Sequence, residues 1–120
     1  SKSLNDTKIY LIQAGAYSTY DSMISNTSVN NYVYYEDDGL YKTIIGITEN
    51  KNNIDKIKST YEGEVIVSEY YSLDNKLNEK IEKYDKEIEK LEDSNEIKNI
   101  VIKMLGVYKD NDNNTLVYIN

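Results

Sequence analysis

The chain has no cysteine, histidine, proline, arginine, tryptophan or phenylalanine among its 120 residues. Without histidine and cysteine it has no Ser–His or Cys–His nucleophile, and no imidazole or thiolate to bind a metal. The lack of cysteine also means that the redox compartment leaves no signature in the sequence. We therefore expect a protein that is not an enzyme and that holds no cofactor.

Positive charge is also scarce. The chain has 14 lysines against 21 acidic residues, a formal charge of −7, and the acidic residues are spread over both halves. Binding to nucleic acid needs a cationic surface, so we expect no nucleic-acid partner. No apolar run approaches the length that crosses a membrane, so we expect no membrane contact by this segment.

Tyrosine is the only aromatic residue, and it occurs thirteen times. Its rings must therefore fill the core, with the hydroxyl groups reaching the surface or a partner. Together with the abundance of lysine, asparagine and isoleucine, this usage is typical of an AT-rich genome. The tyrosines are then core residues first, and a carbohydrate-stacking surface only second.

A short segment occurs twice. Residues 9–15 (IYLIQAG) return as residues 40–46 (LYKTIIG), with an aliphatic residue before the tyrosine and a glycine at the end of each run. Each copy leads into a helix-like stretch, at 18–27 and at 50–61. A strand that stops at glycine and is followed by a short helix is half of a small α/β sandwich. The two copies predict one domain with pseudo-twofold symmetry.

The remaining pattern completes this unit and adds helices to it. Strands are predicted at 8–14, 32–35, 40–47 and 64–68, with a turn before Gly39 that makes a hairpin of the second and third. From 73 to 91 the apolar residues step by three and four, which predicts one long amphipathic helix. A second helix is predicted from Ser94 to a stop at Gly106, and a short strand at 115–119. We favour a helical hairpin packed on the α/β unit over a coiled coil.

The segments 10–17 and 39–46, in this order and with a helix between them, resemble the SPOR (sporulation-related repeat) domain family. That family opens with a strand ending in glutamine, any residue and glycine, and its third strand carries an aromatic residue, then arginine, then an apolar run into glycine. The resemblance covers residues 8–70 as a SPOR-like domain and leaves 71–120 as a helical extension. It implies an α+β fold of βαββαβ order, an RNP-like four-stranded antiparallel sheet backed by two helices.

SPOR domains bind peptidoglycan whose glycan strands have been denuded of stem peptides, at division or sporulation septa. The resemblance thus implies a non-catalytic module that targets a parent protein to the septum, outside the cytoplasm, with the parent anchored by a single membrane pass. Binding would use the open face of the sheet, through Gln13, Leu40 and Lys42, with Ala16 where a small polar residue is common. Other envelope proteins of division or sporulation are further expected partners.

Alternation along a strand divides the candidate residues between the two faces of the sheet. One face carries Ile9, Leu11, Gln13, Leu40, Lys42 and Ile44, and the other, toward the helices, carries Tyr10, Ile12, Ala14, Tyr41, Thr43 and Ile45. A denuded glycan offers hydroxyls, flat C–H faces and lactyl carboxylates, which Gln13, Leu40 and Lys42 respectively suit. Leu40 stands where the family has an aromatic residue and Lys42 where it has arginine. A register shift of one would bring Tyr41 or Tyr35 to the binding face instead.

Plainer interpretations stay open. Gln13 can satisfy a backbone group at the end of a strand, and Leu40 and Ile44 can be core residues beneath the 73–91 helix. In that case the glycan site is occluded, and the chain is a protein-interaction module of the envelope whose sheet face is capped by the C-terminal helices. The acids at 36–38 are typical of a solvated turn, not of a glycosidase pair. Residues 110–114 lack the glycine of a calcium loop and are interpreted as a plain loop.

Overall fold

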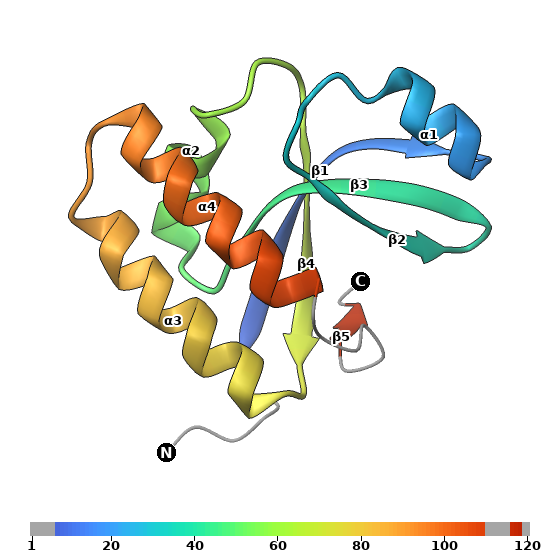
Figure 1. The fold of residues 1–120 in the computed structure, drawn as a ribbon. Helices are drawn as coiled ribbons and strands as arrows, with labels where there is room; N and C mark the ends of the chain where they lie inside the picture. Colours follow the sequence, from blue (N-terminus) through green and yellow to red (C-terminus); the bar gives the residue numbers. More distant parts are fainter. Residues whose placement is uncertain (1–6, 110–115, 119–120) are drawn as a thin grey trace.

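The two copies of the repeated segment lie side by side at the centre of one sheet. In a computed structural model, which describes residues 7–109 and 116–118, β1 (Lys8–Tyr17) pairs antiparallel with β3 (Leu40–Thr48). The other strands are β2 (Val33–Asp37), β4 (Ile66–Ser72) and β5 (Leu116–Tyr118). All neighbours are antiparallel, in the order β2-β3-β1-β4-β5 (Figure 1). The predicted α+β fold is confirmed, with β5 added at one edge.

Local signals explain most of the connections. Asp38 and Gly39 both have positive φ, 52° and 77°, which is the two-residue turn that matches the twist of a hairpin. Thr19 accepts a hydrogen bond from the Ser22 backbone N–H and so begins α1 (Tyr20–Asn26). The Asn50 side chain likewise accepts a hydrogen bond from the Asn52 backbone N–H and so begins the 3₁₀ turn η2 (Lys51–Asn53). This turn leads into α2 (Ile54–Lys58).

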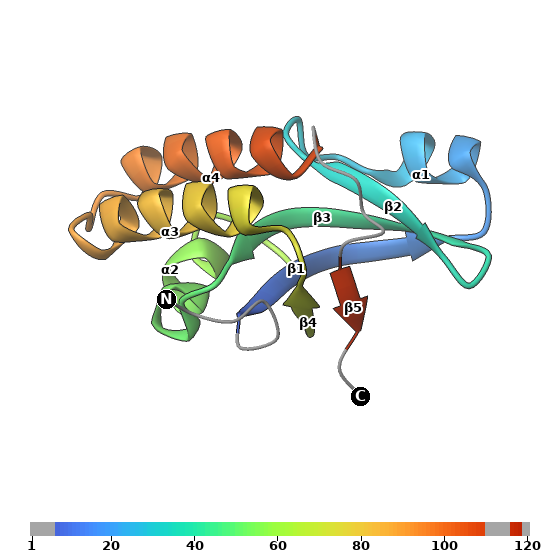
Figure 2. The ribbon, with the colours of Figure 1, turned by 90° about the horizontal axis from the view of Figure 1, so that it is seen from below.

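The C-terminal part forms two long helices, α3 (Asn75–Glu89) and α4 (Ser94–Lys109), which lie side by side across the strands (Figures 1 and 2). Their apolar stripes join a single hydrophobic core with the strands. The core members include Ile9, Leu11, Ile44 and Ile47 from the sheet, Leu77, Ile81 and Ile88 from α3, and Val101, Met104 and Leu105 from α4. The helical hairpin therefore shares its core with the βαββαβ unit.

Several predicted ends are wrong; the fourth strand, for example, runs from Ile66 to Ser72 where 64–68 was predicted. Gly106 does not stop α4, which continues to Lys109 because Tyr108 is still buried against the core and an interior glycine costs a helix only about 0.5–1 kcal/mol. The first-turn N–H groups of α4 are capped by Asp93, one residue before the predicted Ser94. Gly15 does not end β1, which stays paired with β3 as far as Tyr17.

The pairing of β1 with β3 is irregular at its centre. The register passes from Ile12 opposite Gly46 to Gln13 opposite Ile44, so Ile45 is an extra residue on β3; Ala14 is then extra on β1. Such bulges bend a strand and change which face a side chain meets. The bent strands β1 and β3 carry the sheet away from α3 and α4 toward α1 (Figure 1).

A polar junction fixes the helices to the sheet. The buried Asp85 carboxylate on α3 accepts hydrogen bonds from the Thr48 hydroxyl, the Glu49 backbone N–H at 2.9 Å and the Asn53 amide at 3.1 Å. Burial raises the pKa of Asp85, and these hydrogen bonds pull it back in part. Lys56 of α2 donates to the carbonyls of Ile88 and Glu89 at the end of α3, and to that of Leu91 just beyond it at 2.8 Å. These bonds satisfy groups that a helix end leaves unpaired.

Candidate functional site

The sheet face that the sequence assigns to a glycan is covered along half of its length. Ile9, Leu11 and Ile44 are all buried. Tyr108 of α4 lies near Tyr35 and Tyr70. These two tyrosines share one face of the sheet with Ile44 and Ile9, so α4 lies on the face that carries Ile44. Ile44 is therefore a core residue, whereas Leu40 is 37% exposed.

On the same face of the sheet, the hydroxyl groups of two tyrosines from different strands meet. Tyr70 is opposite Ile9, and its hydroxyl is hydrogen-bonded to that of Tyr35. Burial, first, and this hydrogen bond raise the pKa of Tyr35, and burial also raises the pKa of Tyr108 nearby. These phenols are therefore neutral core groups at physiological pH, as expected for a chain that fills its core with tyrosine.

Beyond the covered part, part of the predicted site stays at the surface. Ala16, Lys42 and Tyr35 form one cross-strand row, and Leu40 lies in a neighbouring row opposite Asp37. The Lys42 ammonium is 2.7 Å from the Asp37 carboxylate and 5.9 Å from the centre of the Tyr35 ring. We call Ala16, Leu40 and Lys42 the open end of the sheet. An anion that approaches it must compete with Asp37 for Lys42.

The other two predicted site residues lie elsewhere. Gln13 is nearly buried at the bulge, between Ile44 and Ile66 of the neighbouring strands. Tyr41 is on the opposite face from Lys42, as the alternation predicts, and packs against α1. The structure therefore brings together three of the five residues that the sequence proposed.

Tyr41 belongs to an aromatic cluster that the sequence analysis did not find. Its ring centre is 6.1 Å from that of Tyr20 and 6.0 Å from that of Tyr34, and the Tyr20 and Tyr34 centres are 5.6 Å apart. A hydrogen bond with the Glu36 carboxylate raises the pKa of the Tyr41 hydroxyl. Tyr20 and Tyr34 are exposed. No sequence signal marks Tyr20, because only the docking of α1 brings it to the sheet.

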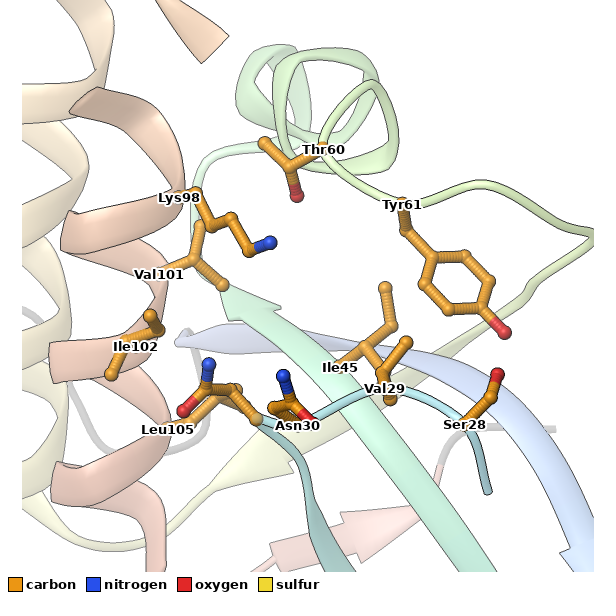
Figure 3. Close-up of a pocket in the computed structure, with 11 residues that line it drawn as sticks. Ser28, Val29, Asn30, Ile45, Thr60, Tyr61, Lys98, Val101, Ile102 and Leu105 are labelled. Atoms are coloured by element: carbon orange, nitrogen blue, oxygen red, sulfur yellow. The ribbon is translucent and has the colours of Figure 1, made fainter. Parts of the chain in front are cut away.

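A cavity of about 240 Å³ lies between α4, residues 28–31 and the end of α2 (Figure 3). Its apolar lining is Val29, Ile45, Val101, Ile102 and Leu105, and its polar lining includes Ser28, Asn30, Thr60, Tyr61 and Lys98. Ile45 reaches it because of the bulge, so the set of residues predicted to face α1 and α2 is divided: Tyr41 meets α1, and Ile45 meets α4. The cavity fits one side chain or a similar small group.

Metal-binding clusters and membrane-spanning helices are both absent from the part of the chain that the structure describes. Residues 7–109 and 116–118 contain no group of three or more acidic residues placed to hold a metal ion. None of the helices there is both long enough and apolar enough to cross a membrane. The 110–114 loop lies outside the described residues.

Comparisons with protein-family models, with curated proteins and with solved structures found no match. The resemblance to SPOR domains rests on the motifs of β1 and β3.

Proposed function

We propose that this chain is a non-catalytic module that binds another protein, with one face of its sheet closed by α3 and α4. The observation that carries this proposal is the burial of Ile9, Leu11 and Ile44 under the helical hairpin. These positions are where the resemblance would place the track of a glycan strand. A polysaccharide needs an extended open surface, whereas these residues belong to the hydrophobic core.

Charge and composition support the same choice. The chain carries −7 and pairs Lys42 with Asp37, so it offers an anionic polymer little attraction. Its exposed large side chains include Tyr20, Tyr34 and Ile66. Tyrosine and aliphatic residues at a surface are typical of protein interfaces. An envelope location for this module rests on the resemblance of β1 and β3 to SPOR domains.

The test is co-sedimentation with cell envelopes before and after trypsin treatment, in parallel with purified wall sacculi before and after amidase treatment. Binding to a protein predicts that the chain pellets with intact envelopes, that trypsin treatment of the envelopes abolishes this, and that neither sacculus preparation pellets it. Pelleting that survives trypsin and rises after amidase treatment would overturn the proposal.

Denuded-glycan binding is the second candidate, and the open end of the sheet favours it. Ala16, Leu40 and Lys42 are adjacent there, with a small residue, an apolar surface and a cation in reach of one sugar unit. The amidase arm tests it directly: pelleting would rise after treatment and fall in Lys42→Glu. The matched control is Lys83→Glu, the same charge change on the polar face of α3.

A further inference from the structure

The first two residues of β4, Ile66 and Val67, are exposed. Ile66 is 62% and Val67 36% exposed, although both are paired with the central strand β1, opposite Gln13 and Ile12. Successive residues of a strand point to opposite faces, so Ile66 and Val67 are exposed on opposite sides of the sheet. Two neighbouring apolar residues that are both exposed on a paired strand are uncommon in a folded domain, and such segments pair with other chains.

The outer edge of the first half of β4 is also open. β5 pairs with β4 only at Tyr70, Tyr71 and Ser72, and no described residue pairs with Ile66–Glu69 on that side. The hydrogen-bond pattern shows which groups point outward. The Ser72 N–H bonds to the Thr7 carbonyl on the β1 side, and in an antiparallel ladder this direction alternates. Val67 and Glu69 therefore direct their N–H and C=O groups away from β1.

The acidic residues around this edge indicate which kind of partner it fits. Glu62 and Glu64 precede the strand and are exposed, Glu69 follows Val67, and none of the three forms an ion pair within the described residues. A second copy of this chain would bring the same three carboxylates and a further net charge of −7. Like charges placed opposite one another oppose pairing.

We infer that the Ile66–Glu69 edge is a strand-addition site for an extended segment of another protein, with apolar residues in the middle and lysine or arginine at its ends. The added strand would bond to the outward backbone groups of Val67 and Glu69 and cover Ile66 and Val67. Its basic ends would lie beside Glu64 and Glu69. Main-chain bonds supply affinity in this mode, and side chains supply specificity. The inference rests on the proposed protein-binding function and names its surface.

The probe is a synthetic peptide in which valine and threonine alternate between paired lysines at each end. It is titrated into the ¹⁵N-labelled chain, and the backbone amide signals are followed. We expect the largest shifts at Val67 and Glu69 and weaker binding in high salt. Two matched peptides serve as controls: one has glutamate in place of each lysine, and the other is N-methylated at alternate residues, which blocks its backbone donors. Neither should bind.

Val67→Pro tests the backbone contact alone. Proline removes an N–H that points away from β1, so the inner ladder keeps its bonds and the fold is retained, as thermal unfolding checks. We expect peptide binding about tenfold weaker, since one buried acceptor of the peptide loses its donor. Ile66→Lys leaves the backbone intact and should also weaken binding of the basic peptide. Ile24→Ser, at an exposed position of α1, is the control that should bind normally.

Four results would overturn the inference: no binding of the basic peptide, equal binding by Val67→Pro, equal binding of the glutamate peptide, or self-association that Val67→Pro abolishes. The last would make a second copy the occupant. Envelope sedimentation separates this failure from that of the proposed function. Trypsin-sensitive pelleting that Val67→Pro leaves unchanged keeps the function and removes the β4 site, whereas no pelleting of the unaltered chain removes the function.

Discussion

The two halves of β3 both carry aliphatic residues, but one half is buried and the other lies at the surface. Ile44 and Ile47 are buried beneath α3 and α4, while Leu40 and Lys42, on the same face, stay at the surface. The difference lies in the extension and not in the strand. A helical hairpin of this length covers one half of the sheet and leaves the hairpin end of β2 and β3 uncovered.

The comparison shows why a motif on a strand is an incomplete guide to a binding face. The same apolar residue is a contact surface for a ligand when the face is open and a core residue when a helix lies on it. What decides is a segment outside the motif. Variants at buried positions, set against variants at exposed ones, test this difference.

The largest contrast is expected between Ile44→Ala and Leu40→Ala. Ile44 is fully buried, so its truncation leaves a cavity and should lower the free energy of unfolding by about 2–5 kcal/mol. Leu40 is exposed, and its truncation should cost less than about 1 kcal/mol. Urea unfolding of the two variants measures both values. Equal costs would mean that the hairpin does not cover β3 as described.

The second contrast is between two acids of α3. In Asp85→Asn the amide that replaces one carboxylate oxygen would face the Glu49 N–H, so we expect a loss of about 1–3 kcal/mol. In Glu89→Gln the exposed side chain still accepts from Asn50, and the change should stay within about 0.5 kcal/mol. Chemical denaturation at neutral pH compares them.

Asp85 also gives a pH dependence. Its pKa is raised in the folded chain above the ordinary value of 3.8, so the folded state binds this proton more tightly than the unfolded state. Stability from this group therefore rises as the pH falls through the folded-state pKa toward 3.8. The advantage of the unaltered chain over Asp85→Asn should widen over that window. Parallel pH profiles of the two proteins would contradict the raised pKa.

The sequence predicted the elements well because the signals are local. The stripe from Leu77 to Ile88 has helical spacing, and an aspartate before Gly39 marks a hairpin turn; both are confirmed. The burial of the central strand on both faces of the sheet was also predictable from the sequence. Residues 9–12 are apolar without alternation, which is typical of a strand buried on both faces. The burial of Asp85 was predictable as well, because Asp85 follows Ile81 by four residues on the buried stripe of α3.

Other features have no local signal. The bulges at Ala14 and Ile45 depend on how β1 and β3 fit each other, and they divide a set of side chains that strict alternation places on one face. The Tyr20, Tyr34 and Tyr41 cluster needs three elements to come together. The bare edge of β4 depends on where β5 stops pairing. Such features follow from contacts between distant segments.

The third contrast is between two glycines. A Cβ at Gly46 would be 2.6 Å from Ile57 Cγ2 and 3.1 Å from Ile12 Cδ1, so Gly46→Ala should overpack the junction with α2 and cost about 1–3 kcal/mol. A Cβ at Gly106 would meet nothing within 4 Å, and α4 is helical on both sides of it. Gly106→Ala should therefore stabilise the chain by about 0.5–1 kcal/mol. Thermal unfolding gives the sign of each change, and a destabilising Gly106→Ala would show that α4 ends where the sequence suggested.

The smallest expected effect belongs to the open end. Lys42→Gln removes the 2.7 Å ion pair with Asp37 at a partly exposed site, which should cost less than about 1 kcal/mol. The cost should shrink further in high salt, because exposed charge pairs are screened. Asp37→Asn is the matched change: it breaks the same pair and removes the carboxylate that competes with an anionic ligand for Lys42. If glycan binding is real, Asp37→Asn should strengthen pelleting with amidase-treated sacculi while Lys42→Gln weakens it. Unchanged pelleting in both variants would leave the open end without a role in binding and make the uncovered half of β3 a plain surface.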